Sequence, residues 1–353
     1  MKRLLVCLSV GGLLVAQQDQ APNTTIRTDV VNVLVPVTVY DRNNNYVHGL
    51  MPDQFRVFDN GKEQNIHQVE VTYTPVSMVV AIQANARADK ILPQVNKIGN
   101  LLKPILLGDQ GEAAVIAFDS RIRTLQDFTP DADKITKAIL SINAGSNSSR
   151  LVDAVEESVR MLKTRNVGRR RILLVIGESR DFGSEARGRE TLIGLQLGNI
   201  TAYWIDMSHL LGILTAPGPD PRPDNSPPAM HPMPGGVPAT PTTVQQMYGT
   251  NGSSAEFIPL MVEIFKDVKN IFKTSPAVLF TRGTGGNEYS FFSQHQLEQT
   301  ISEISDQLHS QYTISYTPNN QTEGGFHQIS VGVIGHDYKC DTRPGYWVAP
   351  KPN

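Results

Sequence analysis

The clearest indication of fold class in this sequence is Met78-Val-Val-Ala-Ile-Gln-Ala-Asn-Ala-Arg87. It opens with an apolar run of the length of a buried strand, and small or polar residues separate this run from a segment with helical spacing. In an open α/β sheet, the loop after such a strand lies at the carboxyl edge, where ligands usually bind. Function is therefore expected at this edge, where the residues available are Gln83, Asn85 and Arg87.

Strands and helices alternate through the middle of the chain. Further buried strands are predicted at 112–118, 171–176, 201–206 and 277–280, and a hairpin partner at 121–128. Apolar residues at helical spacing predict amphipathic helices at 91–102, after Asp131, from Ser149, and at 190–198, 257–272 and 297–308. This order predicts a doubly wound, mostly parallel, Rossmann-like α/β sheet flanked by helices.

Both ends of the chain have the pattern of β structure. Valines at every second position from Val31 to Val39 predict a strand with one buried face, and Asn60-Gly61 predicts a hairpin turn. We expect residues 24–75 and 312–349 to form β segments that could pair into one small β domain. Residues 76–311 would form the α/β domain, interrupted by a proline-rich insertion at 211–254.

The first residues resemble an export signal. Lys2 and Arg3 precede an apolar segment from Leu4 to Ala16, which is too short to span a bilayer and is typical of a signal peptide at 1–16. No later stretch has the length and apolarity of a membrane span, and removal of the signal would leave Cys340 as the only cysteine. We therefore expect an exported protein that is periplasmic, associated with the cell envelope or secreted.

Composition and motifs give little support to catalysis. A formal net charge of −2 gives no reason to expect nucleic acid as a partner. Neither a P-loop nor a dinucleotide-binding glycine motif is present, and Gly177-Glu-Ser-Arg-Asp181 lacks the closing glycine of a nucleophile elbow. Asp153 and Glu178 could meet at the sheet edge as paired carboxylates, or they could serve as capping and solvated loop residues.

The order of these elements resembles a von Willebrand factor type A (VWA) domain, and within that class the exported bacterial VWFA-related family known mainly from acidobacterial proteins. The resemblance covers nearly the whole chain after the signal, apart from the insertion. It rests on Val37-Thr-Val-Tyr-Asp41, His48-Gly-Leu50, Asp53-Gln-Phe-Arg-Val-Phe-Asp-Asn-Gly61, Thr284-Gly-Gly286, Gln311-Tyr312, Tyr316-Thr-Pro318 and Arg343-Pro-Gly-Tyr346.

The resemblance implies protein recognition at a metal-ion-dependent adhesion site, where a D-x-S-x-S loop, a threonine and a later aspartate hold Mg²⁺ or a similar cation. Here Gln83, Asn85 and Arg87 occupy the D-x-S-x-S positions. Ser149 falls at the threonine position and Glu178 at the last aspartate. Because a guanidinium beside Mg²⁺ would be repelled, we expect neither a metal nor another cofactor.

Arg87 itself could replace the ion by pairing with Glu178 or Asp153, or it could point into solvent. The main hypothesis is thus a non-enzymatic, metal-independent binding protein with an unidentified protein ligand. The alternatives are a hydrolase that uses carboxylates at the sheet edge and a structural component of an envelope assembly.

Overall fold

The computed structural model describes residues 32–71, 75–166, 168–215, 275–291, 293–320 and 325–348. The predicted signal peptide, nearly all of the proline-rich insertion and the helix expected at 257–272 lie outside these residues. Within them, no helix is both long and apolar enough to cross a membrane.

A six-stranded sheet forms the centre of the α/β part, in the order β10-β9-β8-β5-β6-β7. All neighbours are parallel except β6 and β7. The strands are β5 (Val76–Gln83), β6 (Glu112–Phe118), β7 (Ile122–Thr129), β8 (Arg170–Gly177), β9 (Ile200–Asp206) and β10 (Glu288–Ser290). The stretch from Met78 to Arg87 therefore supplies β5, which is central in the sheet and pairs with both β6 and β8.

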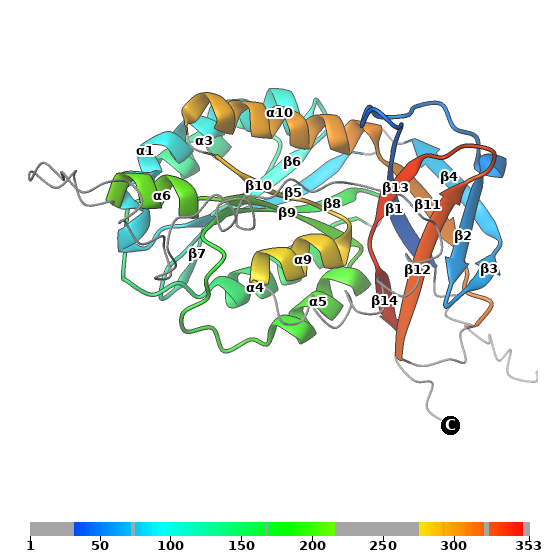
Figure 1. Ribbon diagram of the computed structural model, residues 1–353. Coiled ribbons are helices and arrows are strands. Elements are labelled where there is room, and N and C mark those ends of the chain that lie inside the picture. Colours follow the sequence, from blue (N-terminus) through cyan, green and yellow to red (C-terminus); the bar gives the residue numbers. More distant parts are fainter. Residues whose placement is uncertain are drawn as a thin grey trace, which may run out of the picture. The chain divides into compact units, whose positions relative to one another are not determined.

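Helices cover both faces of this sheet (Figure 1). One face is covered by α1 (Leu92–Val95), α2 (Gly99–Leu101), α3 (Ala132–Leu140) and α10 (Gln294–Ser310), and the other by α4 (Leu151–Lys163), α5 (Gly188–Leu197) and α9 (Pro276–Thr284). Alternate residues of β5 point to opposite sides, so Val80 packs in the first core and Val79 in the second. A further helix, α6 (Ser208–Thr215), follows β9.

Two predicted elements differ from the structure. The expected strand at 277–280 is part of helix α9, whose N-terminus is capped by the Ser275 side chain and followed by Pro276. A four-residue apolar run does not distinguish a strand from a buried helix, and the cap decides the outcome here. The segment 91–102 is buried at the expected positions but is divided into short α, 3₁₀ and π turns.

The two ends of the chain share two antiparallel four-stranded sheets, with the orders β13-β1-β11-β4 and β14-β12-β2-β3. Their strands are β1 (Val33–Tyr40), β2 (Phe55–Asp59), β3 (Lys62–Gln64), β4 (Ile66–Val71), β11 (Tyr312–Tyr316), β12 (Gly325–Val333), β13 (Lys339–Thr342) and β14 (Gly345–Val348). Asn60 and Gly61 form the β2–β3 turn with φ angles of 49° and 76°. The expected fold class, an α/β sheet with β structure from both ends, is confirmed.

Asp59 is the polar centre of this β structure, and its carboxylate is fully buried. It accepts hydrogen bonds from Tyr316 Oη at 2.9 Å, Tyr346 Oη at 2.6 Å, Asn320 Nδ2 at 3.1 Å and His327 Nδ1 at 2.7 Å. Burial first, and then the neighbouring Tyr346 and Asp59, raise the pKa of Tyr316, so its hydroxyl stays protonated and donates. One carboxylate therefore connects strands from the two ends of the chain.

Replacing Asp59 with alanine should lower the free energy of unfolding by about 3–5 kcal/mol, because two tyrosine hydroxyls and His327 would lose a buried acceptor together. Urea denaturation measures the loss. The matched control is Asp337→Ala, which breaks an ion pair to Arg42 in which both side chains are exposed and which should change stability by less than about 1 kcal/mol. Equal effects of the two substitutions would contradict this role of Asp59.

Candidate functional site

Loops from several elements meet at the carboxyl edge of the sheet, where the sequence places the candidate site. They follow β5 and β8, connect β6 to β7, and precede α4. Backbone hydrogen bonds join these loops, from Gly145 to Ala84 (2.7 Å), from Arg150 to Asp119 (2.9 Å) and from Phe182 to Ser149 (2.8 Å). The edge is thus one connected structure, and all five predicted site residues lie on it.

Gln83 and Glu178 join the ends of β5 and β8. Gln83 Nε2 donates to Glu178 Oε2 at 3.1 Å, and the Glu178 backbone N–H donates to Gln83 Oε1 at 2.7 Å. Both side chains are buried. A β-carbon on Gly177 would come within 2.9 Å of Gln83 Oε1, so this pairing needs a glycine at the end of β8. The amide of Gln83 is therefore committed to Glu178 at both of its polar atoms.

Arg87 completes the group around Glu178. Its Nη2 lies 3.1 Å from Glu178 Oε1, with the Arg87 side chain 52% exposed and the Glu178 side chain 5% exposed. Of the alternatives expected for Arg87, the structure thus shows the pair with Glu178. Asn85 has a local role, because its side chain accepts a hydrogen bond from the Ala88 backbone at 3.1 Å and caps the turn that carries Arg87.

Ser149 is held by its backbone, which forms an antiparallel bridge with Phe182. Its hydroxyl is buried and has no hydrogen-bond partner. The Ser148 hydroxyl also donates to the Phe182 carbonyl, at 2.5 Å. These bonds hold the backbone of Phe182, and the residue remains 53% exposed, so a large apolar side chain projects from a fixed backbone at the edge.

The residues at this edge do not fit a divalent cation. A hard divalent cation is held by about six or more oxygen ligands, which include at least one carboxylate free to bind it and often waters. Among the five predicted positions, Glu178 already has an amide and a guanidinium as partners, and Ser149 offers a hydroxyl without a hydrogen-bond partner. Across the described parts of the chain, no group of three or more His, Cys, Asp or Glu side chains is arranged to hold a metal ion.

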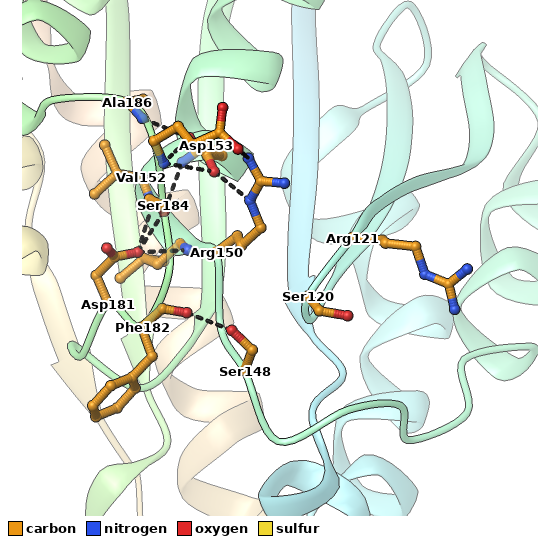
Figure 2. Close-up of polar contacts among 12 residues, drawn as sticks. Ser120, Arg121, Ser148, Arg150, Val152, Asp153, Asp181, Phe182, Ser184 and Ala186 are labelled. Atoms are coloured by element: carbon orange, nitrogen blue, oxygen red, sulfur yellow. Dashed lines mark hydrogen bonds and ion pairs between the residues drawn. The ribbon is translucent and has the colours of Figure 1, made fainter.

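Two further carboxylates hold the loop after β8 against the N-terminus of α4 (Figure 2). Asp181 Oδ1 accepts from the backbone N–H groups of Leu151 at 2.8 Å and Val152 at 3.2 Å, so it caps the helix in place of Ser149, the residue expected to begin it. Asp153 accepts from Arg150 Nε at 2.6 Å and from the Ala186 backbone at 2.8 Å. Asp153 and Glu178, considered above as a carboxylate pair, are held by different partners.

Three residues of this edge were not predicted from the sequence. Asp119 follows strand β6 directly and accepts a hydrogen bond from the Arg121 backbone at 2.8 Å. Its position directly after a predicted buried strand could have marked it as a residue of the carboxyl edge. In the sequence, Asp181 attracts attention only because it occupies the position of the closing glycine in a nucleophile-elbow motif. Phe182 has no local pattern that marks it, because its importance comes from the bridge to Ser149 across the fold.

A mostly parallel sheet with one antiparallel edge strand, helices on both faces and connected loops at its carboxyl edge is the architecture that the resemblance to VWA domains predicts. No protein-family model matches the chain, and no curated protein sequence matches it.

An aerotolerance-related membrane protein from Bacteroides fragilis is 12% identical, with a TM-score of 0.40 over 65% of this chain and 98% of that one. The conserved hypothetical protein BatB from Bacteroides thetaiotaomicron is 13% identical, with a TM-score of 0.39 over 66% and 98%. The vWF domain of the type V pili tip protein Mfa5 from Porphyromonas gingivalis is 13% identical, with a TM-score of 0.26 over 30% and 38%. Similarity at this level says nothing of what the chain binds.

The hydrogen bonds of Asp153 predict that the stability of the fold depends on pH. Burial alone would raise the pKa of Asp153, but hydrogen bonds from Ala186, Arg150 and Glu185 outweigh it and hold the pKa below its usual value. A carboxyl whose folded pKa is lowered stabilises the fold above its unfolded pKa of about 3.9, and this contribution is lost as pH falls through the folded pKa.

Asp153→Asn should therefore be less stable than the native chain at pH 7 and should lose less stability between about pH 5 and pH 2. Thermal unfolding as a function of pH measures both effects. Asp109→Asn, at an exposed loop position, is the control and should follow the native curve. An unchanged acid limb in Asp153→Asn would show that Asp153 contributes nothing to the pH dependence.

Proposed function

We propose that this chain is an exported, non-enzymatic binding protein whose carboxyl-edge loops recognise a protein ligand without a metal ion. The observation that carries the proposal is the Glu178 carboxylate, which is buried and already bonded to Gln83 and Arg87. The negative charge of Glu178 is thereby compensated within the protein by Arg87. The half-exposed guanidinium of Arg87 supplies a positive charge at the solvent side of the carboxyl edge. Export rests on the N-terminal signal pattern in the sequence.

The surroundings of Arg87 support protein recognition. Phe182 offers an exposed ring on a backbone fixed by Ser149, and the side chains of Arg121 and Arg180 are exposed on neighbouring loops of the edge. Aromatic and arginine side chains are the types that dominate binding energy at protein interfaces, and rigid ones lose little entropy on binding. The other four candidate positions would thus support the interface, with Arg87 and Phe182 as its contact residues.

The hydrolase alternative gains no comparable support. Asp153 is ionised and uses both carboxylate oxygens for Arg150, Ala186 and Glu185. Glu178 is engaged separately with Gln83 and Arg87. A hydrolytic pair would need one carboxyl as acid and the other as base or nucleophile on a shared substrate. Turnover of any substrate by the purified chain that is abolished in Glu178→Gln would overturn the non-enzymatic proposal.

Metal independence has a direct test. Titration of the purified chain with Mg²⁺ or Mn²⁺ should give no saturable heat and no saturable thermal shift. The matched variant is Gln83→Asp combined with Arg87→Ser, which returns a carboxylate and a hydroxyl to the edge and should make stability depend on metal concentration. Saturable stabilisation of the native chain at micromolar metal would contradict the proposal.

The contact residues are tested by capture of partners from a cell-envelope extract. Phe182→Ala and Arg87→Ala should each reduce capture of the same partner about tenfold or more, as expected for central interface residues. The control is Leu197→Ala, which removes another exposed apolar side chain, at the end of α5. If all three variants capture the partner as the native chain does, the carboxyl edge is not the binding site, and a structural role in an envelope assembly would be favoured.

A further inference from the structure

A second feature lies at the amino ends of β8 and β9, opposite the edge described above. A cavity of about 170 Å³ opens there, with room for several waters or one small molecule. Its lining includes Arg170 and Arg171 at the start of β8, Thr201 in β9, Thr313 in β11, and Arg343 just before β14. Arginines are the main charged residues of this lining.

Arg343 is buried, at 4% exposure, yet it has no carboxylate as a partner among the described residues. Its Nε has no hydrogen-bond partner, and its guanidinium lies 5.6 Å from the centre of the Tyr346 ring. Burial lowers the pKa of Arg343 to about 10, and the neighbours that oppose this shift are the tyrosines Tyr316 and Tyr346. An arginine with a pKa of about 10 still carries its charge at neutral pH.

The other two arginines also have only neutral partners. Arg170 donates to the Leu308 carbonyl at 2.6 Å and to the Gln311 side chain. Arg171 donates to the carbonyls of Gly198 at 2.9 Å and Arg165 at 2.6 Å, and its Nε is buried without a partner. Burial lowers the pKa of both arginines. Three positive charges therefore share the cavity with hydrogen-bond acceptors that carry no formal charge.

Negative charge at the cavity is limited to one side chain. Among the lining residues the only acid is Glu70, which is exposed and accepts a hydrogen bond from Gln68 at 2.6 Å. Arg169, a fourth lining arginine, is already neutralised by Glu112, with its Nε 3.3 Å from the carboxylate. A water molecule could satisfy a hydrogen bond of Arg343 but not its charge, and a buried unpaired charge is strongly destabilising.

From this arrangement we propose that the cavity is a binding site for a small anion that carries carboxylate or phosphate groups, with Arg343 as its central ligand and Arg171 beside it. Guanidinium groups match the planar, two-oxygen geometry of carboxylates and phosphates. Thr201 and Thr313 line the same cavity, and a hydroxyl from either residue would suit the remaining oxygens of the anion. The site is separate from the carboxyl edge, so it is independent of the proposed protein ligand.

The test is isothermal titration calorimetry on the purified full chain with two probes, inorganic phosphate and citrate, at an ionic strength held constant with sodium chloride. At least one probe should bind saturably with one site per chain, and the stronger probe identifies the anion as a phosphate or a carboxylate. Saturable binding of neither probe above the sodium chloride background overturns the proposal.

Variants assign the binding to this cavity. Arg343→Gln should weaken binding about tenfold or more, while Arg42→Gln, at an exposed arginine of the β1–β2 connection, should leave it unchanged. Equal affinity of the native chain and Arg343→Gln overturns the proposal. Since Arg343 is buried and its replacement could impair folding, a second variant is needed at an exposed position.

Glu70→Gln serves this purpose, because Glu70 is exposed and is the one acid in the lining. Removal of this negative charge should strengthen anion binding by about threefold to tenfold, the opposite direction to Arg343→Gln. An unchanged or weaker affinity in Glu70→Gln would place any bound anion elsewhere and overturn the assignment.

Discussion

The structure of the carboxyl edge depends on the partners that compensate the negative charge of Glu178. Its carboxylate is buried at the end of β8, where an uncompensated charge would cost several kcal/mol. Gln83 at the end of β5 supplies an amide donor, and Arg87 supplies the positive charge from the following turn. The contact of Gln83 joins the neighbouring strands β5 and β8, and in the proposed function Arg87 takes the place of a cation. The remaining edge loops are connected around them by backbone hydrogen bonds.

Much of the fold follows from local pattern. The apolar run that gives β5, the alternating valines of β1 and the Asn60-Gly61 turn each form the structure that their spacing predicts. The run at 277–280 was assigned wrongly because four apolar residues fit a strand or a buried helix equally, and the Ser275 cap selects the helix. The resemblance placed the five candidate positions at one edge of the sheet, whereas the partner of Arg87 depends on the three-dimensional fold.

Contacts between side chains that are far apart in the sequence could not be predicted. Asp181 caps α4 from a loop some thirty residues further along the chain, with separations of 30 and 29 residues to Leu151 and Val152. Asp59 and His327 meet across 268 residues. Arg343 has no local pattern that marks it as an arginine without a carboxylate partner. Such groups are recognised by burial and by the charges around them, which depend on the whole fold.

The two ends of the sheet thus differ in charge balance. At the carboxyl edge, buried carboxylates have their partners within the protein, as Glu178 has in Gln83 and Arg87. At the amino ends of β8 and β9, Arg170, Arg171 and Arg343 have no partner with a formal charge among the described residues, and Arg343 is the most deeply buried of the three. The proposed binding surface at the first and the proposed anion site at the second would be separate functions of one scaffold.

The central claim, that Arg87 stands in for a cation beside Glu178, is tested most directly by a double-mutant cycle. Urea unfolding of the native chain, Arg87→Met, Glu178→Gln and the double variant gives the coupling free energy between the two side chains. We predict a favourable coupling of about 0.5–2 kcal/mol, a modest value because the Arg87 side chain is half exposed. Additive effects, with no coupling beyond experimental error, would contradict the claim.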